Sequence, residues 1–164
     1  MEISIKPARV EDAPELVRVH FNSVHSTGAQ FYSKEICQEW SPVPSQQRTK
    51  ALIQAISSGK EIMFVAWVNS EVAGFASIVP AEFELRAVYV DPKFGRHGVG
   101  RMLLHRVEIE ARNRGLAKLQ MHASLSAEGF YKTQGYKEIA RISHTLVSGK
   151  KMPAIKMEKT IRGG

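Results

Sequence analysis

A glycine-rich, basic stretch separates a strand-like run from a helix-like run in the middle of the chain. Residues 93–104 read KFGRHGVGRMLL, and the VYV of residues 88–90 before it is typical of a strand. Helix N-termini present backbone N–H groups without internal acceptors, and the helix dipole adds partial positive charge there. Glycines let these N–H groups converge without a Cβ in the way. The stretch therefore predicts a phosphate-binding turn, flanked by Arg96 and Arg101.

Two common phosphate-binding loops do not fit these residues. A P-loop requires Lys and then Ser or Thr after its last glycine, whereas Gly100 is followed by Arg101 and Met102. The dinucleotide pattern G-x-G-x-x-G needs glycine at position 103, which is Leu103, and no βαβ unit opens the chain. The alternative at this point is a tight strand-to-helix turn with incidental arginines.

A second patterned stretch, SLSAEGFYKTQGY at residues 124–136, reads as a short helix closed by Gly135. Together with VYVDPKFGRHGVGRMLL at residues 88–104, it closely resembles the GNAT superfamily of acyl-CoA N-acyltransferases. The earlier stretch matches that family's pyrophosphate-loop motif, Q/R-x-x-G-x-G/A, and the later one matches its helix motif, N-x-x-A-x-x-F-Y-x-x-x-G-F/Y. Two positions depart from the pattern, since Gly95 replaces the usual Gln or Arg and Ser124 replaces a common Asn.

The resemblance implies acetyl-CoA as cosubstrate and assigns residues to it. In the family, the pantetheine arm passes between the strand before the loop and the next strand, and pairs with the main chain there. Oriented N–H groups of the loop hold the pyrophosphate at little reorganisation cost. The implied cofactor-binding residues are Val88, Tyr89, Val90, Arg96, His97, Gly98, Val99, Gly100, Arg101 and Ser124. The side chains of Val88 and Val90 also suit an ordinary strand core.

The resemblance also implies a catalytic acid and a catalytic base. Tyr131 matches the family's usual general acid, because a phenol can protonate the departing thiolate. Its alternative role is packing beside Phe130. Glu84 falls where some members carry a glutamate that takes the proton of the amine, and its alternative role is a surface pair with Arg86. Other members use only water relays at this step.

Acceptor specificity in the family is set by the N-terminal helices and the hairpin loops. That region holds His25, Tyr32 and Trp40, the predicted substrate-binding residues, although Trp40 also suits the core. Aromatic side chains can surround a cationic amine. The remaining histidines show no metal-ligand spacing, and we expect them to be structural or exposed, with no metal at the site.

Apolar periodicity and turn residues predict the order β-α-α-α-β-β-β-α-β-α-β-β. The expected strands are residues 2–7, 61–68, 71–79, 82–90, 117–123, 136–143 and 152–160. The expected helices begin near Glu11, at 31–40 with Ser33 as cap, at Ser45 with an end at Gly59, near Gly98 with an end at Gly115, and near Ala127. Val99, Met102, Leu103 and Val107 recur on one helix face.

Within strand 82–90, strict alternation places Glu84 and Arg86 on one face and Leu85, Ala87 and Tyr89 on the other, unless a bulge intervenes. With the resemblance, the pattern indicates an α/β fold with a mixed, mostly antiparallel sheet of about seven strands flanked by helices. The family's sheet is splayed between its fourth and fifth strands. We expect one acyltransferase domain over residues 1–160 and a short tail at 161–164.

Composition narrows the class of protein. The chain has 164 residues, one cysteine and a formal charge of +7, so it has no internal disulfide and favours an anionic partner. We find no signal peptide and no apolar run long enough to span a membrane, which predicts a cytoplasmic protein. No basic stripe or interleaved aromatics indicate nucleic-acid binding.

These observations predict an N-acetyltransferase that moves an acetyl group from acetyl-CoA to a primary amine by direct attack in a ternary complex. The acceptor is a small molecule or a peptide, and homodimers are frequent in the family. The alternative is a catalytically silent module that binds acyl-CoA and senses it.

Overall fold

The computed structural model of the protein describes residues 2–162. Its strands form one seven-stranded sheet in the order β1-β2-β3-β4-β5-β7-β6, in which only the β4–β5 pair is parallel. The strands are β1 (Ile3–Pro7), β2 (Ile62–Val68), β3 (Glu71–Val79), β4 (Glu84–Val90), β5 (Lys118–Ser124), β6 (Lys137–Thr145) and β7 (Lys151–Thr160). The helices are α1 (Ala13–Ser26), α2 (Lys34–Trp40), α3 (Gln46–Ser57), α4 (Val99–Asn113) and α5 (Glu128–Thr133). The expected mixed, mostly antiparallel α/β fold is confirmed.

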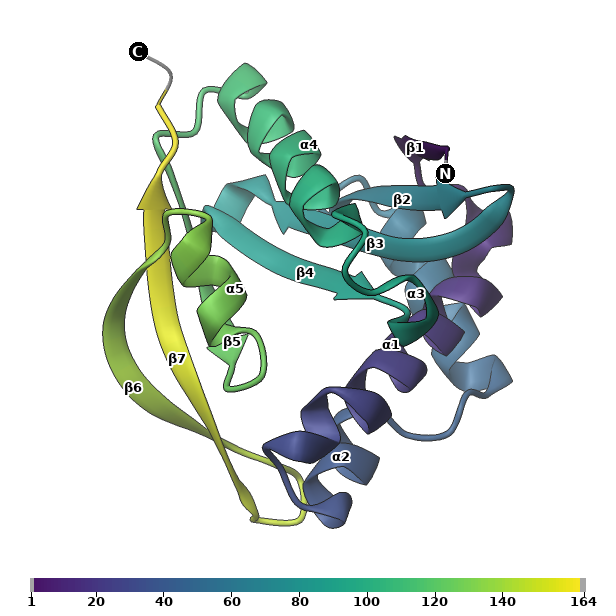
Figure 1. The fold of residues 1–164 in the computed structure, drawn as a ribbon, viewed down its shortest axis with the longest axis vertical. Coiled ribbons are helices and arrows are strands. Elements are labelled where there is room, and N and C mark those ends of the chain that lie inside the picture. Colours follow the sequence, from purple (N-terminus) through teal and green to yellow (C-terminus); the bar gives the residue numbers. More distant parts are fainter. Residues whose placement is uncertain (1, 163–164) are drawn as a thin grey trace.

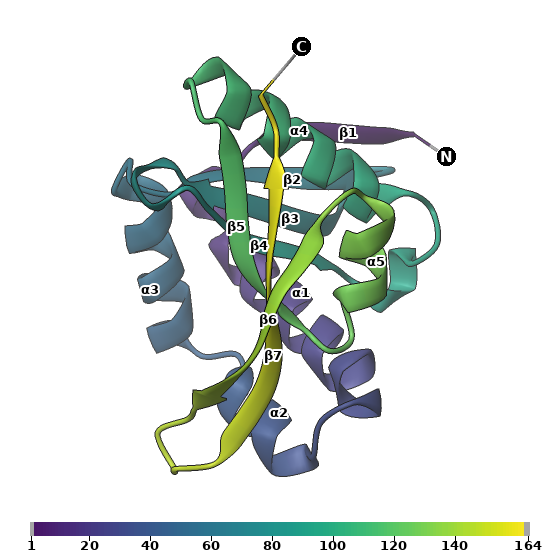
Figure 2. The same ribbon diagram turned by 90° about the vertical axis from the view of Figure 1, so that its left-hand side faces the viewer.

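The helices cover both faces of the sheet (Figures 1 and 2). In Figure 2, α4 lies on one side of β1–β4, and α1 and α3 lie on the other. Two hydrophobic cores correspond to these faces. One packs Leu103 and Val107 of α4 against the sheet, and the other packs Leu16 and Val19 of α1 against the opposite face. Strands β2 and β3 are therefore buried on both faces, whereas β6 at the far edge of the sheet is largely exposed.

Local sequence signals account for most helix ends. The hydroxyls of Ser33 and Ser45 accept hydrogen bonds from the N–H groups of Ile36 and Arg48, so both predicted N-caps are confirmed. The second helix begins only at Lys34, because Phe31 and Tyr32 lie in the turn before it and Ser33 is its cap. The placement of Met102 on the buried face of α4 was wrong, since its side chain is 38% exposed.

A β-bulge in β4 changes which side chains face which core. Ser77 pairs with Ala87 and Ile78 pairs with Leu85, so Arg86 is the extra residue. Leu85 consequently packs in the core beneath α4, whereas Ala87 packs in the core beneath α1. The expectation that Leu85 and Ala87 share a face is wrong for this reason. The bulge directs the main chain of Val88–Val90 along the open edge of the sheet.

The sheet separates between β4 and β5. Their only paired positions are Glu84 and Gln120, and beyond them the two strands diverge (Figure 1). On its other side β4 is held closely to β3, because a Cβ at Gly74 would lie 2.6 Å from the carbonyl oxygen of Tyr89. β5 pairs instead with β7 along its whole length. One edge of β4 is thus left without a strand partner over the residues predicted to meet the pantetheine.

The C-terminal end continues β7 for a short distance. Ile161 is buried, and its N–H donates to the carbonyl oxygen of Ala117 at 2.9 Å. Of the tail expected at 161–164, residues 163 and 164 lie outside the described residues. None of the helices within residues 2–162 combines the length and apolar character that crossing a bilayer requires.

Candidate active site

Two cavities adjoin in the gap between β4 and β5. The first, of about 250 Å³, reaches toward β6 and β7 and is called here the strand cavity. The second, of about 240 Å³, reaches toward the turn before α4 and is called the loop cavity. Both are lined by Trp40, Val88, Tyr89, Ser124, Ala127 and Tyr131. An elongated ligand that enters from the turn before α4 would therefore meet Tyr131 where the cavities join.

The turn before α4 gathers unused backbone donors at one end of the loop cavity. Gly98 is the N-cap of α4 and has a left-handed conformation with φ of 79°, which favours glycine. Arg96 has φ of 66°, so the chain curls sharply before the helix. Among residues 2–162, the N–H groups of residues 96–101 donate no hydrogen bond. Such a set of donors at a helix N-terminus suits a diphosphate.

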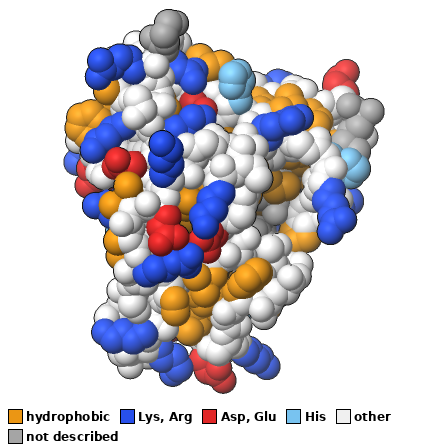
Figure 3. All heavy atoms as spheres, turned by 60° about the vertical axis from the view of Figure 1, so that its left-hand side comes forward, with side chains coloured by type: hydrophobic (Ala, Val, Ile, Leu, Met, Phe, Trp, Pro, Cys, Tyr) orange, Lys and Arg blue, Asp and Glu red, His pale blue; other side chains and the backbone are white. Residues whose placement is uncertain are grey.

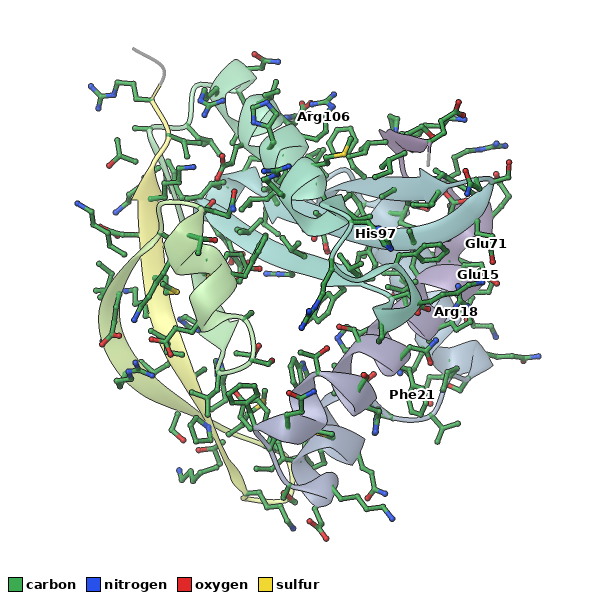
Figure 4. The ribbon with its side chains drawn as sticks, viewed as in Figure 1. Glu15, Arg18, Phe21, Glu71, His97 and Arg106 are labelled. Atoms are coloured by element: carbon green, nitrogen blue, oxygen red, sulfur yellow. The ribbon has the colours of Figure 1, made fainter. Side chains whose placement is uncertain are left out.

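A buried carboxylate holds this turn against α1. Asp91 accepts hydrogen bonds from Arg18 at 2.7 Å, Asn22 at 3.1 Å and the N–H of Lys93 at 3.0 Å. Burial alone would raise the pKa of Asp91, but these hydrogen bonds and the charge of Arg18 lower it, so the carboxylate stays ionised. Figure 4 shows Arg18 on α1, close to the segment that leads toward His97. Sequence reasoning gave no role to Asp91, Arg18 or Asn22.

The glycine at position 100 forms part of the loop cavity wall. A Cβ there would lie 3.6 Å from both the Phe130 ring and Val90, within the space between them. The hydroxyl of Ser124 bonds that of Ser126 at 2.9 Å, and both serines line this cavity. Of the predicted cofactor residues, five line the loop cavity, namely Val88, Tyr89, Val90, Gly100 and Ser124. The other five, Arg96, His97, Gly98, Val99 and Arg101, do not line it.

Tyr131 lies at the junction of the two cavities. Its side chain is 7% exposed, and its ring packs edge-on against Phe130 at 5.2 Å and Tyr136 at 5.6 Å between centroids. Burial, with a smaller contribution from Tyr89, raises the pKa of Tyr131. The side chain therefore remains a neutral phenol, which is a hydrogen-bond donor. Packing and a chemical role are both consistent with this position.

Glu84 lies outside both cavities. Its carboxylate accepts a hydrogen bond from Nε of Arg86 at 2.9 Å, and Arg86 also reaches Glu82 at 3.2 Å. With Gln120, His122 and Lys156 these residues line a separate surface hollow. The role of Glu84 as the catalytic base stays a prediction. A proton passed directly to Glu84 would have to cross from the strand cavity to this surface hollow.

Only one of the three predicted acceptor-binding side chains lines a cavity. Trp40 contributes to both cavities. His25 is 2.8 Å from the carbonyl oxygen of Ser41, and the hydroxyl of Tyr32 donates to the carbonyl oxygen of Pro153 and accepts from the N–H of Leu125. These two side chains tie elements together, since their polar atoms already bond main-chain groups.

Three side chains that sequence analysis did not assign to the site line one of its cavities. His122, His144 and Arg86 line the strand cavity. The alternation of apolar and polar residues along β5 could have predicted the orientation of His122. Its neighbours Met121 and Ala123 are buried, so the His122 side chain points to the opposite face of the strand. No sequence signal pairs it with His144, which comes from β6. Groups of three or more His, Cys, Asp or Glu side chains that would hold a metal do not occur within residues 2–162.

A further cavity, of about 360 Å³, lies between α1 and α3 and shares Arg86, Ala87 and Tyr89 with the strand cavity. It contains His20, whose imidazole bonds the hydroxyl of Ser41 at 2.8 Å. Burial, and to a lesser degree the nearby Arg48, lowers the pKa of His20 to about 4. This imidazole is therefore neutral near pH 7.

Charge on the face formed by β6 and β7 is mixed. Basic side chains are interspersed with acidic ones there (Figure 3), and Glu128 bonds both Lys132 at 2.8 Å and Arg141 at 2.7 Å. This face therefore lacks the single-signed patch that an extended nucleic-acid backbone requires.

Comparison with known proteins gives consistent matches along the chain. The family model described as "Acetyltransferase (GNAT) domain" matches residues 28–161. Spermidine N(1)-acetyltransferase of Thermoplasma acidophilum is 27% identical over an alignment of 146 residues, and the match covers 84% of this chain and 89% of that protein. A GCN5-related N-acetyltransferase structure from Rhodopseudomonas palustris superposes with a TM-score of 0.86 at 26% identity, covering 98% of this chain and 96% of that one.

The PaiA N-acetyltransferase of Thermoplasma acidophilum, solved in complex with coenzyme A, superposes with a TM-score of 0.79. Its identity is 22%, and the match covers 98% of this chain and 99% of that one. At this identity the likeness shows a shared fold.

Proposed function

Because the chain belongs to the GNAT acetyltransferase family, we propose that it transfers an acetyl group from acetyl-CoA to a primary amine. Acetyl-CoA supplies an activated thioester. The acceptor amine attacks it directly while both are bound, and no acetylated side chain intervenes. The acceptor is a small molecule or a peptide with a free amino group.

The free N–H groups of residues 96–101 are the observation that carries this proposal. They lie at the N-terminus of α4, where the helix dipole adds to their attraction for an anion, and the loop cavity leads from them to Tyr131. Arg96 and Arg101 are exposed and add positive charge beside them. A diphosphate bound there would direct an attached thioester into the gap between β4 and β5.

Two groups at the gap then act on the reacting atoms. The unpaired edge of β4 offers main-chain donors near Val88–Val90 to the pantetheine and to the thioester oxygen, where negative charge develops. The neutral phenol of Tyr131 lies where the cavities adjoin and gives a proton to the departing thiolate. Both the position of Tyr131 and its neutral phenol therefore support a role as proton donor.

The polyamine-acetylating relative suggests spermidine as the first acceptor to test. The strand cavity offers Trp40 as an aromatic surface for an amine, but no Asp or Glu is among the described residues that line it. A polycation gains most from acidic walls, so we include monoamines and peptides with a free amino terminus beside polyamines.

The test is release of thiol from acetyl-CoA in the presence of spermidine, phenethylamine or a short peptide that begins with alanine. We expect release to depend on the amine, and mass spectrometry to find one added acetyl group on the acceptor. Calorimetric binding of acetyl-CoA without amine-dependent release from a broad amine panel would instead favour a silent acyl-CoA-binding module.

A further inference from the structure

Two imidazole rings meet on the wall of the strand cavity. His122 lies on β5 and His144 on β6, and their ring centroids are 5.0 Å apart across β7. Both line the cavity that contains Tyr131. Neither ring has a hydrogen-bond partner among residues 2–162, in contrast to His20 and His25, which bond Ser41. The pair therefore has free nitrogen atoms on the wall of the cavity that also contains Tyr131.

Charged groups surround His122 from every neighbouring strand. Lys156 is its register partner on β7, His144 approaches from β6, and Glu84 and Arg86 come from β4. Burial lowers the pKa of His122, with further lowering by His144 and Lys156, and Glu84 opposes this change. The balance keeps the ring neutral near pH 7, which is the form that accepts a proton.

We propose that the His122–His144 pair is the base that removes the proton from the acceptor's ammonium group. This inference rests on the acetyl transfer proposed above. The ammonium gives one proton to an imidazole, and the neutral amine forms the C–N bond as the C–S bond breaks. Tyr131 protonates the thiolate sulfur, and the second proton lost from nitrogen restores the phenol. The imidazolium then passes its proton outward, so one proton is released per acetyl group transferred.

The position of His122 supplies the outward route. Its side chain lines both the strand cavity and the hollow that contains Glu84 and Lys156. The Glu84 carboxylate lines that hollow but not the strand cavity, and it bonds Arg86. Imidazole is also a much stronger base than a carboxylate. The proton therefore leaves the pair for solvent through that hollow.

The test compares single and double substitutions of the pair in the full chain. Thiol release is measured at saturating acetyl-CoA, with the best acceptor among spermidine, phenethylamine and an alanine peptide. His122→Ala and His144→Ala should each lower kcat about tenfold and the double variant about 100-fold. The Kd of acetyl-CoA should stay within twofold, and added imidazole should restore part of the rate in the double variant. His105→Ala is the matched control, because that side chain is exposed on α4 and lines neither cavity.

Two further readouts separate a chemical role from a structural one. In the wild type, kcat should rise with pH and level off once His122 is neutral, whereas in the double variant it should keep rising toward the pKa of the free amine. By NMR, replacing His144 with Ala should raise the pKa of His122, because the neighbouring ring that lowers it is removed.

Three outcomes would overturn the proposal. Wild-type kcat and an unchanged pH profile in the double variant would exclude the pair as the base. A large loss of kcat in Glu84→Gln with both histidine variants fully active would assign the base to the carboxylate. If no amine accelerated thiol release by the wild type, the proposed acetyl transfer would be wrong, and the role of the histidine pair would be wrong with it.

Discussion

Substitution of Tyr131 by phenylalanine tests the proposed acid at a single atom. The hydroxyl has no hydrogen-bond partner among residues 2–162, and the ring contacts with Phe130 and Tyr136 remain in the variant. Folding stability should therefore change by less than about 0.5 kcal/mol. General acid catalysis contributes about 100-fold or more to a rate, so kcat should fall about 100-fold, or roughly 2.7 kcal/mol in the barrier.

The assay measures thiol release at saturating acetyl-CoA and a range of acceptor concentrations, beside calorimetric binding of acetyl-CoA. We expect kcat to fall while the Kd of acetyl-CoA stays within twofold, because the phenol proton matters only as the C–S bond breaks. Wild-type turnover in Tyr131→Phe would refute the assignment. An equal loss of acetyl-CoA affinity would show that the residue serves binding instead.

Tyr136→Phe is the matched control, since it removes the same atom from a neighbouring ring. The Tyr136 hydroxyl donates to the buried carboxylate of Glu108 at 2.9 Å, and Lys159 is 3.1 Å from that carboxylate. Loss of a hydrogen bond to a charged group costs about 1.5–3 kcal/mol, so the melting temperature should fall while kcat is retained. The two variants should thus show opposite patterns.

Three other substitutions test the turn before α4 and the cavity beneath α3. Gly98→Ala forces a side chain into a left-handed conformation at a cost of about 1 kcal/mol, and calorimetry should show weaker binding of coenzyme A because the N–H groups no longer converge. Asp91→Asn removes the ionic partner of Arg18, so coenzyme A affinity should fall with little change in the kcat reached at saturation. Because the pKa of His20 is lowered to about 4 in the folded protein, the unfolded chain protonates this histidine first as pH falls. The stability of the wild type should therefore decrease between about pH 6.5 and about pH 4. In thermal melts, His20→Gln should flatten this dependence on pH.

The order of helices and strands along the chain and the glycine-rich turn before α4 could be predicted from local patterns. Caps such as Ser45 act within a few residues, and the glycines near Gly98 specify a turn whatever lies around them. The bulge at Arg86 could not be predicted, because it depends on how β4 registers against β3, which no pattern within β4 encodes. Met102 was misplaced because helical periodicity alone does not show how far the sheet extends beneath α4.

The candidate site shows the same division between local and long-range information. Tyr131 and the loop residues belong to contiguous motifs, so the resemblance located them on the chain. The His122–His144 pair arises from strands that β7 separates, and the Asp91–Arg18 bond joins α1 to the end of β4. Contacts of this kind are set by tertiary packing. His25 and Tyr32 were chosen for side-chain type, but their polar atoms already bond the main chain.

The most direct test of the account maps coenzyme A on the backbone of the free protein. Amide NMR shifts recorded while coenzyme A is added should change most at residues 96–101, with further changes along Val88–Val90 and at Ser124. Shifts that concentrate on another surface, or an absence of saturable shifts, would contradict the claim that the N–H groups before α4 bind the diphosphate.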